Sequence, residues 1–232
     1  LGLSSDHKYI AEVDAELGRP GQTLVEVFDL NDKILDIENK SLTHRPDTFG
    51  LIGFAREVSG ILGQKFSEPV SFDQAIDKIS DEITIEIADQ KLCPRYSACL
   101  VEVKDLNLSQ PVAPEFSDLY NMTEDSVLLA KSGINSVNPI VDATNLTMLE
   151  LGQPLHAFDY DKFVKIGGLD YAKIIVRAAR SGEKLTLLDG KTIELNSNDI
   201  VITSNDIPVA LAGAMGGEST KIDTSTTRIL LE

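Results

Sequence analysis

The chain has 232 residues, a hydrophobic fraction of 42% and a formal net charge of −16 at pH 7. These values are typical of a globular protein with a real core, and no apolar run approaches the roughly 20 residues of a membrane-spanning helix. The acidic balance excludes a broad basic surface for nucleic acid, because phosphate contacts need clustered Lys and Arg, so any nucleic acid must be held locally or by partner chains.

The first predicted elements lie in the N-terminal third. Residues 1–36 are acidic and broken by G-R-P-G, which indicates the end of a preceding module. From Pro46 to Gly63, apolar residues recur at helical i, i+3, i+4 and i+7 spacing, with the proline as the start signal and the glycine as the stop signal. This pattern predicts a helix of about four turns.

After residue 80, apolar and polar residues alternate along the chain. E-I-T-I-E-I at 82–87 and S-A-C-L-V-E-V at 97–103 predict half-buried strands, and D-S-V-L-L-A-K-S-G at 125–133 predicts a short helix with a glycine stop. The last third is predicted to be strand punctuated by turns, with Asp189-Gly190 as a hairpin signal. Strand pairs joined by tight turns, with few helices, predict an α+β fold built mainly of antiparallel sheets.

Three segments could carry chemistry. His156, in L-E-L-G-Q-P-L-H-A-F-D, could be an acid/base group oriented by Asp159, or it could simply bond backbone beside a turn. The glycines of G-A-M-G-G-E from Gly213 could let backbone N–H groups approach a ligand, or they could form a tight turn between packed strands. V-D-A-T-N at 141–145 could end a strand inside a pocket or form an Asx turn.

Other sites are disfavoured by the sequence. Cys93 and Cys99 match neither C-x-x-C nor a four-ligand zinc pattern, so we expect reduced thiols and no metal. No serine or cysteine lies in a nucleophile motif. If the chain is an enzyme, its nucleophile is therefore expected to be water.

Read together, ordered motifs resemble one family. They are T-H-R-P-D-T-F-G-L-I-G-F-A-R-E-V, C-P-R-Y-S-A, N-P-I-V-D-A-T-N-L-T-M-L-E-L-G-Q-P-L-H-A-F-D, G-E-K-L-T-L-L-D-G and P-V-A-L-A-G-A-M-G-G-E. In this order they resemble the β subunit of bacterial phenylalanyl-tRNA synthetase over essentially the whole chain. The chain departs from that family at His44, where asparagine is usual, and at G-L-D-Y-A-K near Gly168, which resembles an insertion.

The resemblance implies a domain organisation. Residues 1–36 would be the tail of a tRNA-binding-like oligonucleotide-binding domain, 37–70 a helical segment with the H-R-P-D motif, and 71–232 a C-terminally truncated B3/B4 editing domain. Such a domain would hydrolyse tyrosine wrongly attached to phenylalanine tRNA. The editing domain would need no cofactor. The whole enzyme would be a cytoplasmic (αβ)₂ heterotetramer, in which the α subunit uses ATP and Mg²⁺ to attach phenylalanine to tRNA.

The resemblance also implies the site residues. His156 would position substrate or water, and general-base action is the alternative role. Thr144, Asn145, Gly216 and Glu232 would bind substrate, and Glu232 resembles the acidic residue that recognises the tyrosine hydroxyl. A Thr-Asp-Ala-like stretch that completes the family's pocket would lie beyond the last residue, so the pocket is expected to be incomplete here.

Some interpretations compete with this one. Arg95 and Tyr96 are interpreted as structural, because their motif is far from the others in sequence. A non-catalytic tRNA-binding and assembly module is the alternative function, and the acidity mildly favours it. A free-standing editing protein is disfavoured by Arg45-Pro46-Asp47 and the helix that follows, which resemble the full synthetase subunit.

Overall fold

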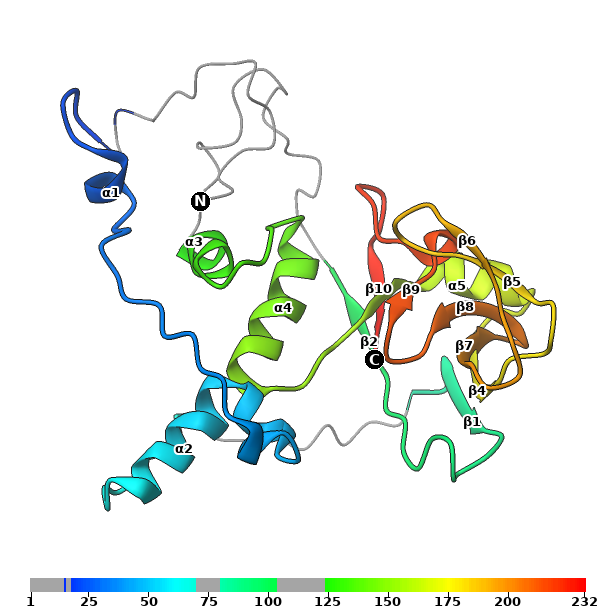
Figure 1. Cartoon of the computed structure of the whole chain (residues 1–232). Helices are drawn as coiled ribbons and strands as arrows, with labels where there is room; N and C mark the ends of the chain where they lie inside the picture. The colour runs from blue at the N-terminus through cyan, green and yellow to red at the C-terminus, as the bar shows by residue number, and fades with distance from the viewer. Residues whose placement is uncertain (1–14, 16–17, 70–79, 104–123) are drawn as a thin grey trace. The chain divides into compact units, whose positions relative to one another are not determined.

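A computed structural model describes residues 15, 18–69, 80–103 and 124–232 (Figure 1). The described residues fall into two compact units. The first comprises those within Leu1–Ser71 and Ser109–Pro154, and the second those within Phe72–Leu108 and Leu155–Glu232. The boundary expected between residues 70 and 71 lies outside the described residues, so the predicted domain limits stay a prediction.

The first unit is helical in its described part. Its elements are α1 (Leu24–Val27), the 3₁₀ turns η1 (Lys40–Leu42) and η2 (Pro46–Phe49), α2 (Leu51–Ile61), α3 (Glu124–Lys131) and α4 (Pro139–Leu151). The short helix predicted at 125–133 is confirmed as α3.

The helix predicted between Pro46 and Gly63 is confirmed, but it is divided into η2 and α2. Gly50 separates the two parts with an extended backbone at φ −109° and ψ 154°. A Cβ atom on Gly50 would lie 2.2 Å from the backbone nitrogen of Gly152, at the end of α4. The break therefore follows from a close approach of two backbones that only glycine permits.

The expectation for V-D-A-T-N was wrong, because these residues lie inside α4 rather than at a strand end or in a turn. The helix begins earlier. The Asn138 side chain accepts hydrogen bonds from the backbone N–H groups of Ile140 and Val141, both at 3.0 Å, and Pro139 occupies the first helical turn. The side-chain cap is thus made by Asn138, and Gly152 ends the helix at φ +75°.

The second unit is mainly strand. A five-stranded sheet has the order β1-β4-β7-β8-β9, a three-stranded sheet the order β2-β10-β3, and a two-stranded sheet joins β5 and β6. The strands are β1 (Ile83–Ile87), β2 (Cys99–Glu102), β3 (Ala157–Asp159), β4 (Ala172–Ala178), β5 (Lys184–Thr186), β6 (Thr192–Glu194), β7 (Ile200–Ser204), β8 (Ile207–Leu211), β9 (Met215–Gly216) and β10 (Arg228–Leu231). Every named pair is antiparallel except β1 with β4, which confirms the predicted α+β class.

Tight turns connect several of these strands as predicted. Asp189-Gly190 lies in the β5–β6 hairpin, with Gly190 at φ +80°. In G-A-M-G-G-E, Gly213 at φ +69° lies in the turn between β8 and β9, which confirms the tight-turn interpretation.

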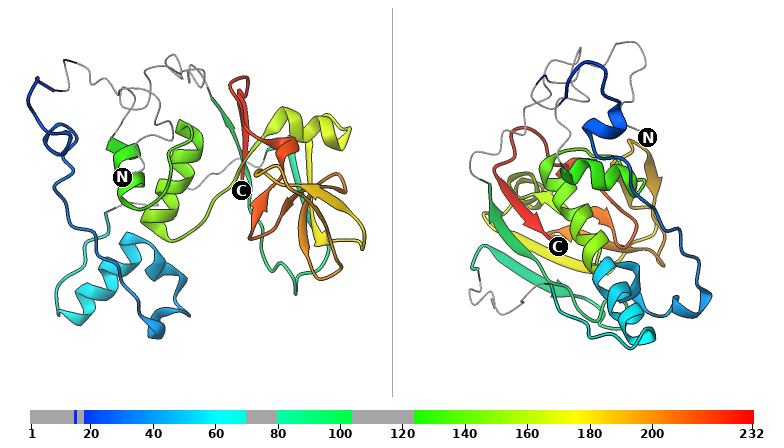
Figure 2. Two further views of the ribbon diagram at one scale, coloured as in Figure 1. Left: turned by 45° about the horizontal axis from the view of Figure 1, so that its top comes forward. Right: turned by 90° about the vertical axis from the view of Figure 1, so that its left-hand side faces the viewer.

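One helix of the second unit, α5 (Tyr160–Gly167), packs beside β3, β4, β7 and β10 (Figure 2). Asp159 caps its N-terminus by accepting a hydrogen bond from the Lys162 backbone N–H at 3.0 Å. The same buried carboxylate accepts the Thr226 hydroxyl at 2.7 Å. Asp159 is therefore a helix-start residue, and its carboxylate is used by the cap and by Thr226 rather than for orienting His156.

The core of the second unit lies between α5 and the strands. Phe158, Phe163, Ile174 and Leu230 are completely buried there. Tyr96 and Ala98, from the segment that leads into β2, and Leu100, from β2 itself, pack against the same cluster. This packing fixes the ends of β2, β3 and β10, where the candidate site lies.

Candidate functional site

His156 and Glu232 lie opposite each other just beyond the paired ends of β3 and β10. The Glu232 backbone N–H donates to the His156 carbonyl at 2.9 Å, and the His156 N–H donates to the Glu232 carbonyl at 3.3 Å. This exchange continues the antiparallel register in which Leu231 faces Ala157. Because directly opposed residues project to the same face of a sheet, both side chains lie on one face.

Gly216 lies against the His156 ring. A Cβ atom on Gly216 would be 2.4 Å from both Cε1 and Nε2 of His156. The Gly216 carbonyl accepts a hydrogen bond from the Leu188 N–H at 3.1 Å, which anchors the backbone at this point. Three of the five predicted site residues are therefore neighbours in the structure, drawn from β9 and the ends of β3 and β10.

Tyr96 is an additional neighbour that the sequence interpretation missed. Its phenol hydroxyl donates a hydrogen bond to Oε2 of Glu232, across 136 positions in sequence. The distance of C-P-R-Y from the other motifs along the chain was therefore a poor reason to interpret Tyr96 as structural. A usable signal was present, because Tyr96, Ala98 and Leu100 alternate in the pattern of residues that share one face of a strand.

Burial dominates the electrostatics of these groups. It lowers the pKa of His156, which favours the neutral imidazole. Burial raises the pKa of the Glu232 carboxyl, and the hydrogen bond from Tyr96 opposes that rise. Burial and the neighbouring carboxylate both raise the pKa of Tyr96, so the proton stays on the phenol and Glu232 is the acceptor.

The His156 ring is held by packing. It makes an edge contact with the Phe158 ring, with centroids 4.5 Å apart and an interplanar angle of 81°. Among the described residues its ring nitrogens make no hydrogen bond. A neutral imidazole with a free nitrogen can accept a proton from water or orient a water molecule, and the adjacent carboxylate can accept a hydroxyl.

Thr144 and Asn145 lie in the first unit, on α4. Both are half-buried, and the Thr144 hydroxyl donates to the Val141 carbonyl at 2.7 Å. Their assignment as substrate-binding residues stays a prediction.

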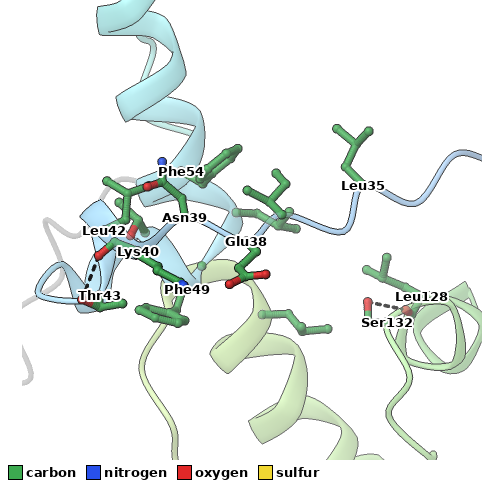
Figure 3. A pocket seen from close by; sticks show the side chains of 15 residues that line it. Leu35, Glu38, Asn39, Lys40, Leu42, Thr43, Phe49, Phe54, Leu128 and Ser132 are labelled. Carbon is green, nitrogen blue, oxygen red and sulfur yellow. Dashed lines mark hydrogen bonds between the residues drawn. The ribbon is translucent and has the colours of Figure 1, made fainter.

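The first unit also contains a cavity of about 580 Å³ (Figure 3). Its walls include the apolar side chains of Leu35, Phe54 and Leu128. The hydroxyls of Thr43 and Ser132, which also line it, donate to backbone carbonyls at 3.1 and 3.0 Å. None of the five predicted site residues lines this cavity, and the charged side chains at its wall, Glu38 and Lys40, are both exposed.

Comparison with known proteins identifies the family. Residues 123–232 match the family described as the B3/4 domain. Over its whole length the chain is 37% identical to a phenylalanine–tRNA ligase beta subunit from Desulfotalea psychrophila and 38% identical to one from a Synechococcus species. The chain belongs to the phenylalanine–tRNA ligase beta-subunit family. The Streptococcus pyogenes beta subunit is 40% identical over 92% of the chain.

The chain spans about a quarter of the length of these beta subunits, between 24% and 27%. A solved N-terminal fragment of the phenylalanyl-tRNA synthetase beta-subunit from Pyrococcus horikoshii overlaps 81% of this chain and 51% of that fragment, with 17% identity and a TM-score of 0.38. That likeness is too low to bear on the fold or the function.

The five predicted site residues all lie within the B3/4 match, whereas Tyr96 precedes it. Cys93 and Cys99 are free thiols. Among the described residues, no three His, Cys, Asp or Glu side chains gather as a metal site. None of the described helices has the length and apolar character needed to cross a membrane.

Proposed function

We propose that this member of the beta-subunit family hydrolyses tyrosine from misacylated phenylalanine tRNA. The observation that supports this proposal is the grouping of a carboxylate, a neutral imidazole and a bare glycine backbone at Glu232, His156 and Gly216. A carboxylate that already accepts a phenol hydroxyl, here from Tyr96, has the chemistry needed to recognise tyrosine.

The need for such a site follows from the limits of apolar recognition. A pocket that selects phenylalanine rejects an isostere with one added hydroxyl by only about 100-fold. A second site can separate the two amino acids by offering the hydroxyl an acceptor. Leaving a phenol unpaired on burial costs roughly 1 to 3 kcal/mol, and Glu232 would recover that loss for tyrosine alone.

In the proposed reaction, water attacks the ester carbonyl that joins tyrosine to the terminal ribose. His156 orients this water and, in its neutral form, can take its proton. The C–O bond to the ribose breaks, the ribose oxygen leaves with a proton, and free tyrosine departs. Gly216 keeps the space next to His156 open, because any side chain there would overlap the ring.

The remaining assignments complete the proposal. Thr144 and Asn145 would contact the substrate. Attachment of phenylalanine to tRNA, with its ATP and Mg²⁺, would belong to a partner α subunit in a cytoplasmic (αβ)₂ enzyme. One observation favours a second candidate, a binding and assembly module without chemistry: the net charge of −16 gives the chain little attraction for tRNA.

The test compares Glu232→Ala with the wild type in the complete beta subunit assembled with its α subunit. Deacylation of tyrosyl-tRNA bearing the phenylalanine anticodon should fall about 10- to 100-fold, since the phenol loses a charged acceptor. Glu194→Ala, at an exposed position of β6, is the matched control and should leave the rate unchanged.

Two results would contradict the proposal at different points. An unchanged rate in Glu232→Ala would remove this residue from tyrosine recognition. No tyrosine release by the wild type would leave the binding-module function.

A further inference from the structure

Tyr96 is held in place from two sides. Its ring packs against the buried core of the second unit, and its hydroxyl donates to Oε2 of Glu232. It lies three residues before β2, and β2 pairs with β10 so that Cys99 faces Leu231. The strand register therefore brings the phenol donor to the carboxylate that follows β10.

The hydrogen bond from Tyr96 uses only one of the two carboxylate oxygens of Glu232. Among the described residues, Oε1 of Glu232 has no hydrogen-bond partner. An ionised carboxylate can accept about four hydrogen bonds through its two oxygens. A second phenol can therefore bind at Oε1 while Tyr96 remains at Oε2.

We propose that Tyr96 is a positioning residue that determines specificity, by holding the Glu232 carboxylate so that its free oxygen meets the hydroxyl of the tyrosyl group. This inference rests on the proposed function. Tyr96 and the substrate would then bind one carboxylate at the same time, through two phenol hydroxyls.

The alternative is competition, in which Tyr96 must leave Glu232 before a substrate can bind. The packing disfavours it. The ring of Tyr96 is fixed against the core, so displacement would leave its half-buried hydroxyl without its acceptor. The two arrangements predict opposite effects when the Tyr96 hydroxyl is removed. If Tyr96 positions the Glu232 carboxylate, the substrate should bind more weakly; if Tyr96 competes with the substrate, the substrate should bind more tightly.

The arrangement also has a consequence for pH. The hydrogen bond from Tyr96 lowers the pKa of Glu232 against the effect of burial, so its removal should raise that pKa. Two other titratable groups lie at this pair. The Cys93 thiol lies near Tyr96 and donates to the Arg95 carbonyl at 3.3 Å, and His156 pairs with Glu232 through the backbone. Both are present in the wild type and in a Tyr96→Phe variant, so the difference between their pH profiles reports on Glu232.

The experiment uses the complete beta subunit assembled with its α subunit and measures steady-state deacylation of tyrosyl-tRNA between pH 5 and 8. In Tyr96→Phe we expect KM to rise about tenfold, as for loss of one hydrogen bond to a charged group. We expect kcat to change less than twofold. The acidic limb of kcat/KM should move to higher pH, because the neutral carboxyl forms at a higher pH.

Tyr171→Phe is the matched control, because it removes a phenol hydroxyl from a half-buried tyrosine of the same unit that has no hydrogen bond to Glu232. Its KM and pH profile should equal those of the wild type. A lower KM in Tyr96→Phe would establish competition and overturn the proposal, and so would an unchanged KM and pH profile. If the wild type releases no tyrosine, the proposed function is refuted, and the role of Tyr96, which depends on it, is refuted as well.

Discussion

Gly216→Ala adds one methyl group at the point where β9 meets the His156 ring. The added Cβ would lie 2.4 Å from Cε1 and Nε2 of His156, well inside van der Waals contact. The backbone at Gly216 has no positive φ, so alanine can occupy it without backbone strain. The ring, at the end of a side chain, is therefore the part that moves.

The expected magnitudes follow from what the ring loses. Its edge contact with Phe158 contributes about 0.5 to 1.5 kcal/mol, so the free energy of unfolding should fall by about 1 kcal/mol. A proton-transfer group contributes about 10²- to 10⁴-fold to rate, and displacing it should slow tyrosyl-tRNA deacylation by at least about 100-fold. Phenylalanine attachment should be retained.

Gly213→Ala separates these two effects. Gly213 has a φ of +69° and open space around its missing Cβ, so alanine there strains the backbone by about 1 kcal/mol without touching His156. The two variants should therefore lose similar stability in urea denaturation but differ by about two orders of magnitude in deacylation. Equal deacylation rates in the two variants would refute the assignment of His156 to the reaction.

Three further outcomes are expected. Asp159→Ala should lower the free energy of unfolding by about 2 kcal/mol in urea denaturation, because α5 loses its cap and the buried Thr226 hydroxyl its acceptor. The control Asp161→Ala removes an exposed ion pair with Arg228 and should lower the free energy of unfolding by less than about 1 kcal/mol. An equal loss of stability in the Asp159 and Asp161 variants would contradict the role given to Asp159. In thermal unfolding, Gly60→Ala should stabilise α2 by about 0.5 to 1 kcal/mol, because its Cβ meets open space. Gly50→Ala should instead destabilise the first unit by about 1 to 3 kcal/mol, because its Cβ would meet the Gly152 backbone. The His156 resonance in an NMR titration, assigned with His156→Gln, should have its midpoint below 6.5 because burial lowers the pKa, and a midpoint above 6.5 would contradict this.

The elements that could be predicted from the sequence are those with local causes. Pro46 and Gly63 bound the helical region because one residue fits the first turn of a helix and the other adopts a left-handed conformation at its end. Asp189-Gly190 produces a hairpin for the same kind of reason, since the turn needs a positive φ at its glycine. Such signals act within a few residues, so they can be read without knowledge of the fold.

Other features depend on residues that are distant in sequence. V-D-A-T-N has the composition of a turn, yet the cap at Asn138 starts a helix that contains it. The parallel pairing of β1 with β4 joins Ile83 to Ala172, and no local pattern indicates that contact. The division of the predicted helix at Gly50 likewise depends on the end of α4.

The candidate site depends on the register of β3 against β10. Leu230 faces Phe158 in that register, and both side chains are completely buried. Glu232, two residues after Leu230, faces His156, two residues before Phe158, on the same face of the sheet. A slip of one residue would turn Leu230 and Glu232 to the opposite face, and the loss of core burial opposes it. The packing that stabilises the second unit therefore also places the Glu232 and His156 side chains on one face of the sheet, and neither motif alone indicates that the two residues are paired.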